Sequence, residues 1–198
     1  MNFNSIEEKH TESVKQLLLC NKKNVFLYKL GENEYNIKLT STNEHINFIN
    51  IINFNIYQIL GEVNTNHIES CTMIKQISKD TATFLFKFKS IGGLDNIPKK
   101  YMYVETKCNQ IYNNKIEYVS SNLLCDNLIE KYVNKYEQIT CHKSTLSIEL
   151  LNNNHTINME YYFNIDIHEN LPYFAQDILG YMMNKMLLNL KLFIENIQ

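Results

Sequence analysis

The sequence contains few of the residues that break or cross-link a chain. It has 5 glycines and 2 prolines in 198 residues, so no flexible linker is visible. Its 5 cysteines are odd in number, widely scattered and without a C-x-x-C pair. This pattern favours reduced thiols in the cytosol over a disulfide framework. We therefore expect one domain over residues 1–198, which is long enough to bury a sizeable core.

Strong charge and long apolar runs are also missing. The net charge is −2, which gives no general attraction to nucleic acid. No uninterrupted apolar run is long enough to span a bilayer. The first residues, MNFNSIEEKHTESVKQLLL, carry acidic side chains where a signal peptide needs a basic region. The sequence thus predicts a cytoplasmic monomer that does not bind nucleic acid.

Motifs for metal binding and catalysis are absent as well. The 6 histidines show no metal-ligand spacing, and neither H-E-x-x-H, G-x-S-x-G nor a glycine-rich phosphate loop occurs. Cys141 and His142 are adjacent, so on a strand they point to opposite faces and make a poor nucleophile–base pair. We therefore expect no catalytic residue, no metal and no cofactor.

Short strands dominate the predicted secondary structure. Ser5 and Glu8 fit a capping box for a first helix, whose apolar side includes Leu17 and Leu18. A second, short helix is predicted over residues 55–63, and a loop with Gly92 and Gly93 over 91–98. Alternation and turn residues predict strands at 24–30, 34–39, 45–52, 68–77, 81–89, 101–111, 115–124, 136–141, 145–151 and 156–167. This order of elements is typical of an α+β domain with a curved antiparallel sheet.

The last stretch, residues 169–198, is predicted to be one long amphipathic helix. Asn170 can cap its start, and Pro172 suits the first turn. Apolar side chains recur at helical spacing at Phe174, Ile178, Tyr181 or Met182, Met186, Leu190, Phe193 and Ile197. A late helix that lies across an antiparallel sheet can close a cavity, so a container for an apolar ligand is the leading interpretation.

The order of these elements resembles that of the START (StAR-related lipid-transfer) domain, which belongs to the Bet v 1-like helix-grip folds. Besides the final helix, two stretches carry the resemblance: FLFKFKSIGGLDNIPKKYMYVETKCNQIYNNKIEYVSSNL and CHKSTLSIELLNNNHTINMEYYFNIDIHENLP. The resemblance covers roughly the whole chain. Some positions depart from the family pattern. Lys99 and Lys100 stand where an Arg-Asp pair is common, His168 and Glu169 where Gly is common, and tryptophan is absent.

The resemblance implies a helix-grip fold with a cavity between the curved sheet and the C-terminal helix. The cavity would hold one lipid, for which a phospholipid is the first expectation and a sterol the alternative. Such a protein carries lipid between membranes without covalent chemistry and contacts membrane surfaces transiently. The loop at 91–98 and the start of the terminal helix would form the mouth of the cavity.

Candidate lipid contacts lie on neighbouring strands and on the final helix. Phe84, Phe86 and Phe88 share one strand face, and core packing under a helix is the alternative to ligand contact. On the next strand an acid stands beside aromatic rings, a combination that suits a cationic head group. The further candidates are Tyr101, Tyr103, Glu105, Tyr161, Phe174, Ile178, Met182 and Met186.

Two other functions stay open from the sequence. A small cyclase-like or hydrolase-like enzyme of the same fold class would pair Glu105 with Tyr103 or Tyr161 in the cavity. Alternatively, the exposed side of the apolar terminal helix could make a dimer interface. Converging ionisable groups would favour the enzyme, and a concentration-dependent mass would favour the dimer.

Overall fold

The computed structural model describes residues 16–89, 91, 97–112, 114–172 and 175–198. The strands are β1 Leu17–Lys22, β2 Val25–Gly31, β3 Glu34–Thr42, β4 Ile68–Ser78, β5 Thr81–Phe88, β6 Lys100–Tyr112, β7 Lys115–Asn122, β8 Glu137–Gln138, β9 Thr140–Leu151 and β10 Thr156–Asp166. The helices are α1 Asn55–Val63, α2 Glu130–Val133 and α3 Ile178–Asn196, with a 3-10 helix, η1, at Phe48–Asn50.

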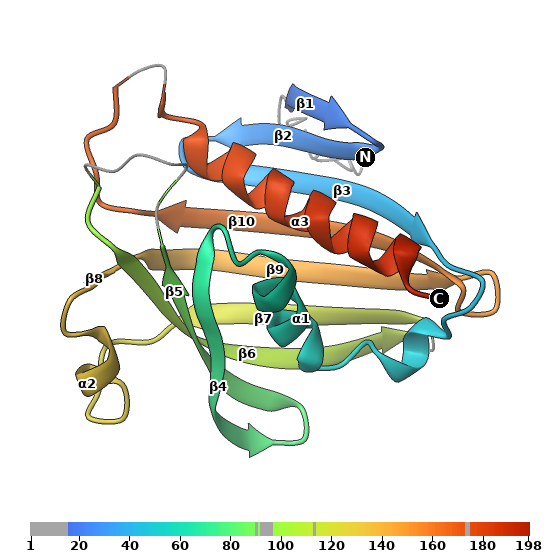
Figure 1. Ribbon diagram of the computed structural model, residues 1–198, viewed down its shortest axis with the longest axis horizontal. Helices are drawn as coiled ribbons and strands as arrows, with labels where there is room; N and C mark the ends of the chain where they lie inside the picture. Colours follow the sequence, from blue (N-terminus) through green and yellow to red (C-terminus); the bar gives the residue numbers. More distant parts are fainter. Residues whose placement is uncertain (1–15, 90, 92–96, 113, 173–174) are drawn as a thin grey trace, which may run out of the picture.

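One large sheet forms the body of the fold. Its strand order is β1-β2-β3-β10-β9-β7-β6-β5-β4, and each neighbouring pair in this order is antiparallel. The short strand β8 pairs in parallel with β6. Helices α3 and α1 lie side by side over one face of the curved sheet (Figure 1). The predicted α+β helix-grip architecture is therefore confirmed. Within the described residues, no helix has both the length and the apolar character needed to cross a membrane.

The pleat of β5 and β6 divides their side chains between two hydrophobic clusters. Phe84, Phe86 and Phe88 belong to the main core under the helices. Leu85 points the opposite way and joins a second cluster with Tyr101, Tyr103, Ile129 and Val133. The last of these residues lies on α2, a helix that the sequence analysis does not predict. The second face of β5 and β6 is therefore covered rather than solvated.

Two of the predicted elements have a different structure from the one expected. The strand predicted at 45–52 is wrong, because Asn43 and Asn47 accept the backbone N–H groups of His45 and Ile49 and turn the chain into η1. The first predicted helix is wrong at Leu17 and Leu18, which lie in β1 and pair with β2. Residues 1–15, which include Ser5 and Glu8, lie outside the described residues.

The strand predicted at 136–141 is also wrong as a single element. The chain there forms two separate strands, β8 and the start of β9. Residues 100–101 of β6 pair with β8, whereas β9 pairs with β7 and β10. The two segments therefore join different neighbours in the sheet.

The terminal helix begins later than predicted. It starts at Ile178, so the proposed cap at Asn170 and first-turn role of Pro172 are wrong. The residue before the helix, Asp177, accepts hydrogen bonds from Lys29 Nζ at 2.6 Å and Tyr35 Oη at 2.9 Å. These contacts tie the start of α3 to β2 and β3. The buried face of the helix includes Leu179, Met182, Met183, Met186, Leu187, Leu190 and Ile194.

Gly180 allows α3 to approach the sheet closely, and replacing it with alanine is expected to destabilise the protein. A Cβ atom there would lie 2.7 Å from Cε1 and 2.8 Å from Cδ1 of Tyr35. That ring is 1% exposed and stacks on Phe163 with centroids 5.4 Å apart, so it has little freedom to move. The gain in helix propensity is about 1 kcal/mol, and overpacking costs about 1–3 kcal/mol.

We therefore expect Gly180→Ala to lower the unfolding free energy in urea by about 1 kcal/mol. Lys185→Ala, at an exposed position of the same helix, should change it by no more than about 0.5 kcal/mol. A more stable Gly180→Ala variant would show that Tyr35 yields easily and that the approach is not tight.

Candidate functional site

A cavity lies between the sheet and the two helices that cover it. It offers about 40 Å³ to the centre of a water-sized sphere. Because one water needs roughly 10–15 Å³ by this measure, the cavity has room for about three waters. The lining residues are Ile56, Tyr57, Leu60, Phe86, Phe88, Met102, Val104, Ser120, Ser144, Leu146, Tyr161, Met183, Met186, Leu187 and Leu190.

The lining is apolar except for four neutral hydroxyl groups. No charged side chain is among the described residues that line the cavity. Ser144 Oγ donates to Tyr161 Oη at 3.1 Å, and Ser120 Oγ lies 2.8 Å from Thr106 Oγ1 just outside the lining. Such a wall suits an apolar ligand with few polar groups.

Burial keeps the phenols of this cavity protonated. It raises the pKa of Tyr57 and of Tyr161 far above the ordinary value of a phenol. The nearby hydroxyls of Ser120 and Thr106 lower the pKa of Tyr57, and the hydrogen bond from Ser144 lowers that of Tyr161, but burial outweighs both effects. Both tyrosines are therefore neutral hydrogen-bonding groups at physiological pH and not bases.

The structure brings some of the predicted site residues to this cavity. Phe86, Phe88, Tyr161 and Met186 line it. Phe84 and Met182 are buried in the surrounding core without lining it, and Ile178 is half-buried against that core. Phe174 lies outside the described residues.

Tyr101, Tyr103 and Glu105 are not part of the cavity wall. The side chains that β6 contributes are Met102 and Val104, which alternate with these three. Tyr101 Oη instead donates to Gln138 at 3.0 Å, and Tyr103 packs in the second cluster. The expected pairing of Glu105 with Tyr161 does not form, because the two side chains belong to opposite faces of the sheet.

Sequence reasoning missed several lining residues that a closer use of alternation would have found. Ser120 follows Ile116 and Tyr118 at two-residue spacing on β7, and Ser144 precedes Leu146 in the same way on β9. Small polar residues such as these two serines interrupt the apolar pattern, so hydropathy alone does not mark them as lining residues. Tyr57 lies on the predicted helix 55–63, but no local pattern distinguishes it from that helix's other apolar residues.

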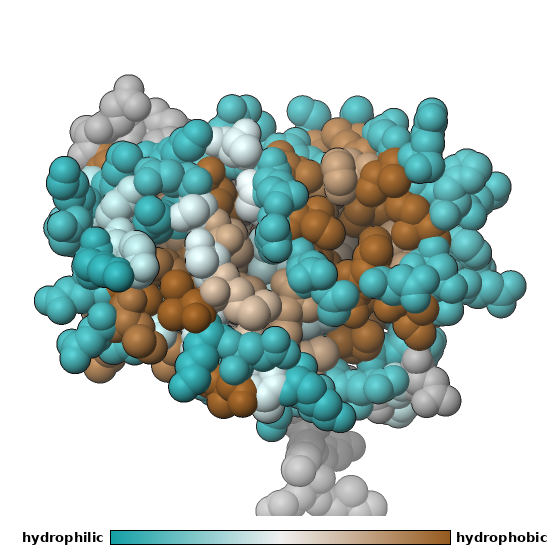
Figure 2. Space-filling view, turned by 60° about the horizontal axis from the view of Figure 1, so that its bottom comes forward, coloured by the Kyte–Doolittle hydropathy of each residue, from teal (hydrophilic) through white to brown (hydrophobic). Residues whose placement is uncertain are grey.

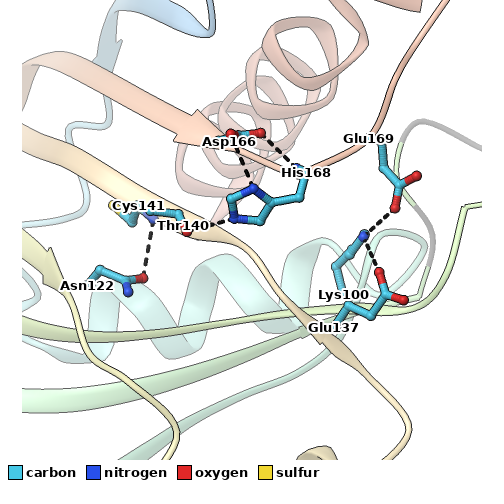
Figure 3. Close-up of polar contacts among 8 residues, drawn as sticks. All are labelled: Lys100, Asn122, Glu137, Thr140, Cys141, Asp166, His168 and Glu169. Atoms are coloured by element: carbon cyan, nitrogen blue, oxygen red, sulfur yellow. Dashed lines mark hydrogen bonds and ion pairs between the residues drawn. The ribbon is translucent and has the colours of Figure 1, made fainter.

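A buried ion cluster joins Lys100 to Glu137 and Glu169 (Figure 3). Lys100 lies two residues before Met102, which lines the cavity. The Lys100 side chain is fully buried, and its Nζ lies 2.6 Å from Glu137 Oε2 and 2.5 Å from Glu169 Oε1. Burial lowers the pKa of Lys100, but the hydrogen bonds and charges of the two carboxylates outweigh burial and raise it overall. The cluster joins β6 and β8 to the segment that leads into α3.

His168 fixes the turn between β10 and α3 (Figure 3). Its backbone has φ 58°, its Nε2 lies 2.7 Å from Thr140 Oγ1, and its Nδ1 lies 3.3 Å from Asp166 Oδ2. Asp166 also accepts the His168 backbone N–H at 2.7 Å. Nearby, Asn122 Oδ1 accepts the backbone N–H of Cys141 at 3.3 Å. The order hydroxyl–imidazole–carboxylate resembles a hydrolase triad, but His168 is half exposed and does not line the cavity.

The Glu69 carboxylate is expected to give the protein part of its acid sensitivity. Hydrogen bonds from Tyr136 and then from Lys99 lower the pKa of Glu69 from 4.5 to about 2. Its folded pKa therefore lies below its unfolded pKa, so the stabilisation is complete above about pH 5 and is lost as pH falls towards 2. Because this site lies at the surface, we expect the Glu69 carboxylate to contribute only about 1 kcal/mol to the unfolding free energy.

The test compares the unfolding free energy of Glu69→Gln and the unchanged protein across that pH range. The two should differ at neutral pH and converge on the acid side. Glu62→Gln, at an exposed position of α1, serves as the matched control and should follow the unchanged protein. A constant difference between Glu69→Gln and the unchanged protein at all pH values would contradict the assignment.

Hydrophobic side chains gather around a hollow on the side of the molecule where α1 and η1 lie (Figure 2). Ile49 of η1 and Phe193 of α3 are 49% and 43% exposed. Half-buried apolar side chains on the same elements or beside them pack against the main core at Ile51, Ile59, Val63 and Leu192. Apolar side chains therefore lie near the cavity beside the polar exposed residues of α1, which are Asn55, Gln58 and Glu62.

Solved structures of lipid-transfer domains share this architecture. The human StarD13 (DLC2) lipid transfer and protein localization domain superposes with a TM-score of 0.69 at 9% identity, covering 92% of this chain and 90% of that one. Human StAR-related lipid transfer protein 5 gives 0.66 at 11% identity, with 93% and 90% covered. A STAR-related lipid transfer protein fragment from Xanthomonas axonopodis gives 0.60 at 7% identity, with 90% and 98% covered.

The sequence itself gives no comparable signal. No protein-family model matches it, and no curated protein matches it. The predicted START-type helix-grip fold is confirmed by the structural similarity alone, which at these identities shows the fold.

Proposed function

We propose that this START-type domain binds a lipid in the cavity under α1 and α3 and carries it between membranes. The uncharged, largely apolar lining is the observation that carries the proposal. Burial of a lipid chain there would contribute about 0.8 kcal/mol per CH₂ group, which is enough to hold it against water. The names of the similar structures, which are lipid-transfer domains, support the same conclusion. A phospholipid cargo, the first expectation from the sequence, stays a prediction.

Lipid entry requires the cavity to expand, because it now has room for about three waters only. Met183, Met186 and Met102 lie in its walls, and methionine adapts its shape at low cost.

Helix α1 is the shorter of the two helices that cover the cavity, and it packs against α3 and β4. Asn64 holds its end by donating to the Met186 carbonyl at 3.1 Å and accepting from Asn189 at 2.9 Å. An outward movement of α1 would open the cavity, and we propose that the surface with the exposed Ile49 and Phe193 meets the membrane.

Non-covalent binding fits the lining better than catalysis does. The ionisable groups among the described lining residues are Tyr57 and Tyr161, and both stay protonated. No carboxylate or imidazole stands beside them in this lining to act as a general base.

Native mass spectrometry of the purified protein, followed by solvent extraction of any adduct, tests the proposal. We expect one lipid per chain, and movement of a labelled lipid from donor to acceptor vesicles at a rate that rises with protein concentration. Labelled phosphatidylcholine in the same assay tests the phospholipid expectation. A protein without an adduct that also takes up no lipid from mixed vesicles would overturn the proposed function.

A further inference from the structure

A row of hydroxyl side chains crosses the cavity side of the sheet. In the strand register, Thr106 of β6 faces Ser120 of β7, and Ser120 faces Ser144 of β9. These three side chains are 0%, 6% and 6% exposed. Their neighbours on the same faces are larger and apolar, including Val104 and Leu146. The row therefore makes a polar band in an apolar floor, and its small side chains leave room beneath the helices.

Two tyrosines reach this hydroxyl row from opposite sides. Tyr57 comes from α1, and its phenol lies near Ser120 and Thr106, whereas Tyr161 comes from β10 and accepts a hydrogen bond from Ser144. A phenol that accepts in this way keeps its own hydrogen for another partner. The cavity therefore contains neutral donors whose partners can be supplied by a ligand.

A third tyrosine beside the row has a buried hydroxyl without a partner. Tyr118 is 1% exposed, and its oxygen makes no hydrogen bond with the described residues. The Cys108 thiol lies near it but forms only a weak contact. Its ring meets the Tyr57 ring edge-on, with centroids 5.9 Å apart. Leaving a buried hydroxyl unpaired costs about 1–3 kcal/mol, but Tyr118 does not line the cavity and is not part of the proposed ligand contact.

No charge is available in the lining to receive an ionic group. The buried cation nearest along β6 is Lys100, two residues from the lining residue Met102, and it is already paired with two carboxylates. An anionic or zwitterionic head group placed at the row would lose its hydration without a counter-charge. A single hydroxyl group, in contrast, needs one donor and one acceptor, which the row provides.

We infer that the bound ligand is a lipid with one uncharged hydroxyl group, which enters first and is held by the row Thr106, Ser120 and Ser144 with Tyr57 and Tyr161. This inference rests on the proposed function and names the class of its ligand. A sterol and a long-chain alcohol both carry the required chemistry. In either case the apolar body lies against the methionines and leucines of α3.

The test measures affinity for matched probes presented in phosphatidylcholine vesicles. The probes are cholesterol, cholesteryl methyl ether, hexadecanol and labelled phosphatidylcholine. We expect cholesterol or hexadecanol to bind more tightly than the methyl ether and the phospholipid. Whichever of cholesterol and hexadecanol binds more tightly shows whether the apolar part of the ligand is a ring system or a linear chain. Combining Ser144→Ala with Tyr161→Phe should lower the affinity for the hydroxylated probe about 5- to 30-fold. This is the effect expected from the loss of one or two hydrogen bonds. Binding of the methyl ether should change little.

Ser147→Ala is the matched control, because Ser147 lies on the same strand but alternates with the cavity residues Ser144 and Leu146. It should bind every probe as the unchanged protein does, and equal thermal unfolding of the variants excludes misfolding. Tight binding of phosphatidylcholine, or equal binding of cholesterol and its methyl ether, would overturn the inference but leave the proposed function standing. Failure to bind any probe would contradict the proposed function itself.

Discussion

Lys100→Ala is expected to lower the unfolding free energy by about 2–4 kcal/mol, because it removes the cation of a buried ion cluster. The lysine side chain is fully buried between two carboxylates. Its removal leaves Glu137 and Glu169 facing each other without the cation that holds them. The effect lies below the full range for a broken buried ion pair because Glu137 is 59% exposed and can turn towards water.

Urea unfolding of the variant and of Lys99→Ala provides the comparison. Lys99 is the adjacent lysine, is 54% exposed and pairs with Glu69, so its loss should cost about 0–1 kcal/mol. Adding Glu169→Gln to Lys100→Ala should restore part of the lost stability by removing one of the facing charges. Equal effects of Lys100→Ala and Lys99→Ala would mean that the buried cluster contributes no more than a surface pair.

Met186→Trp is expected to reduce lipid uptake roughly tenfold or more while leaving the chain folded. Met186 is 1% exposed and lines the cavity from α3. The flexible methionine can give way to a ligand, whereas an indole is larger and rigid and would occupy the space over the hydroxyl row. Overpacking should also cost about 1–3 kcal/mol of unfolding free energy.

Tyr181→Trp places the same side chain on the same helix at a position that is 45% exposed, and it should take up lipid normally. The natural chain has no tryptophan, so each variant carries a single indole whose fluorescence reports on its surroundings. The indole fluorescence of Met186→Trp should be that of a side chain in an apolar environment. That of Tyr181→Trp should be that of a side chain in contact with water. Full lipid uptake by a folded Met186→Trp variant would show that lipid binds elsewhere.

Alternation and helical spacing predict much of this fold. The helix over residues 55–63 has the predicted bounds, and Phe86 and Phe88 reach the cavity as the pattern of β5 indicates. These elements follow local rules, because a strand with one aromatic face buries that face in almost any sheet. The Met186 position on α3 follows from helical spacing for the same reason.

Other features depend on contacts between distant parts of the chain and leave no local signal. The face of β6 that meets the cavity is decided by α2, which covers Tyr101 and Tyr103 from the other side. The start of α3 is set by the ion cluster at Lys100 and by the contacts of Asp177. The hydroxyl row assembles from three strands, so it exists only once the register of the sheet is known.

The pairing of β3 with β10 has a consequence for the order in which the molecule can assemble. Thr42 lies opposite Thr156 and Glu34 opposite Asn164, so these partners are separated by more than half of the chain. During synthesis, strands β1 to β3 can form a three-stranded meander, but β3 has no partner on its other edge until β10 has left the ribosome. Helix α3 is made after β10 and then covers β2 and β3. Contacts this distant slow folding. The nascent chain therefore exposes the apolar face of its first strands for most of its translation, the period in which a chaperone would matter most.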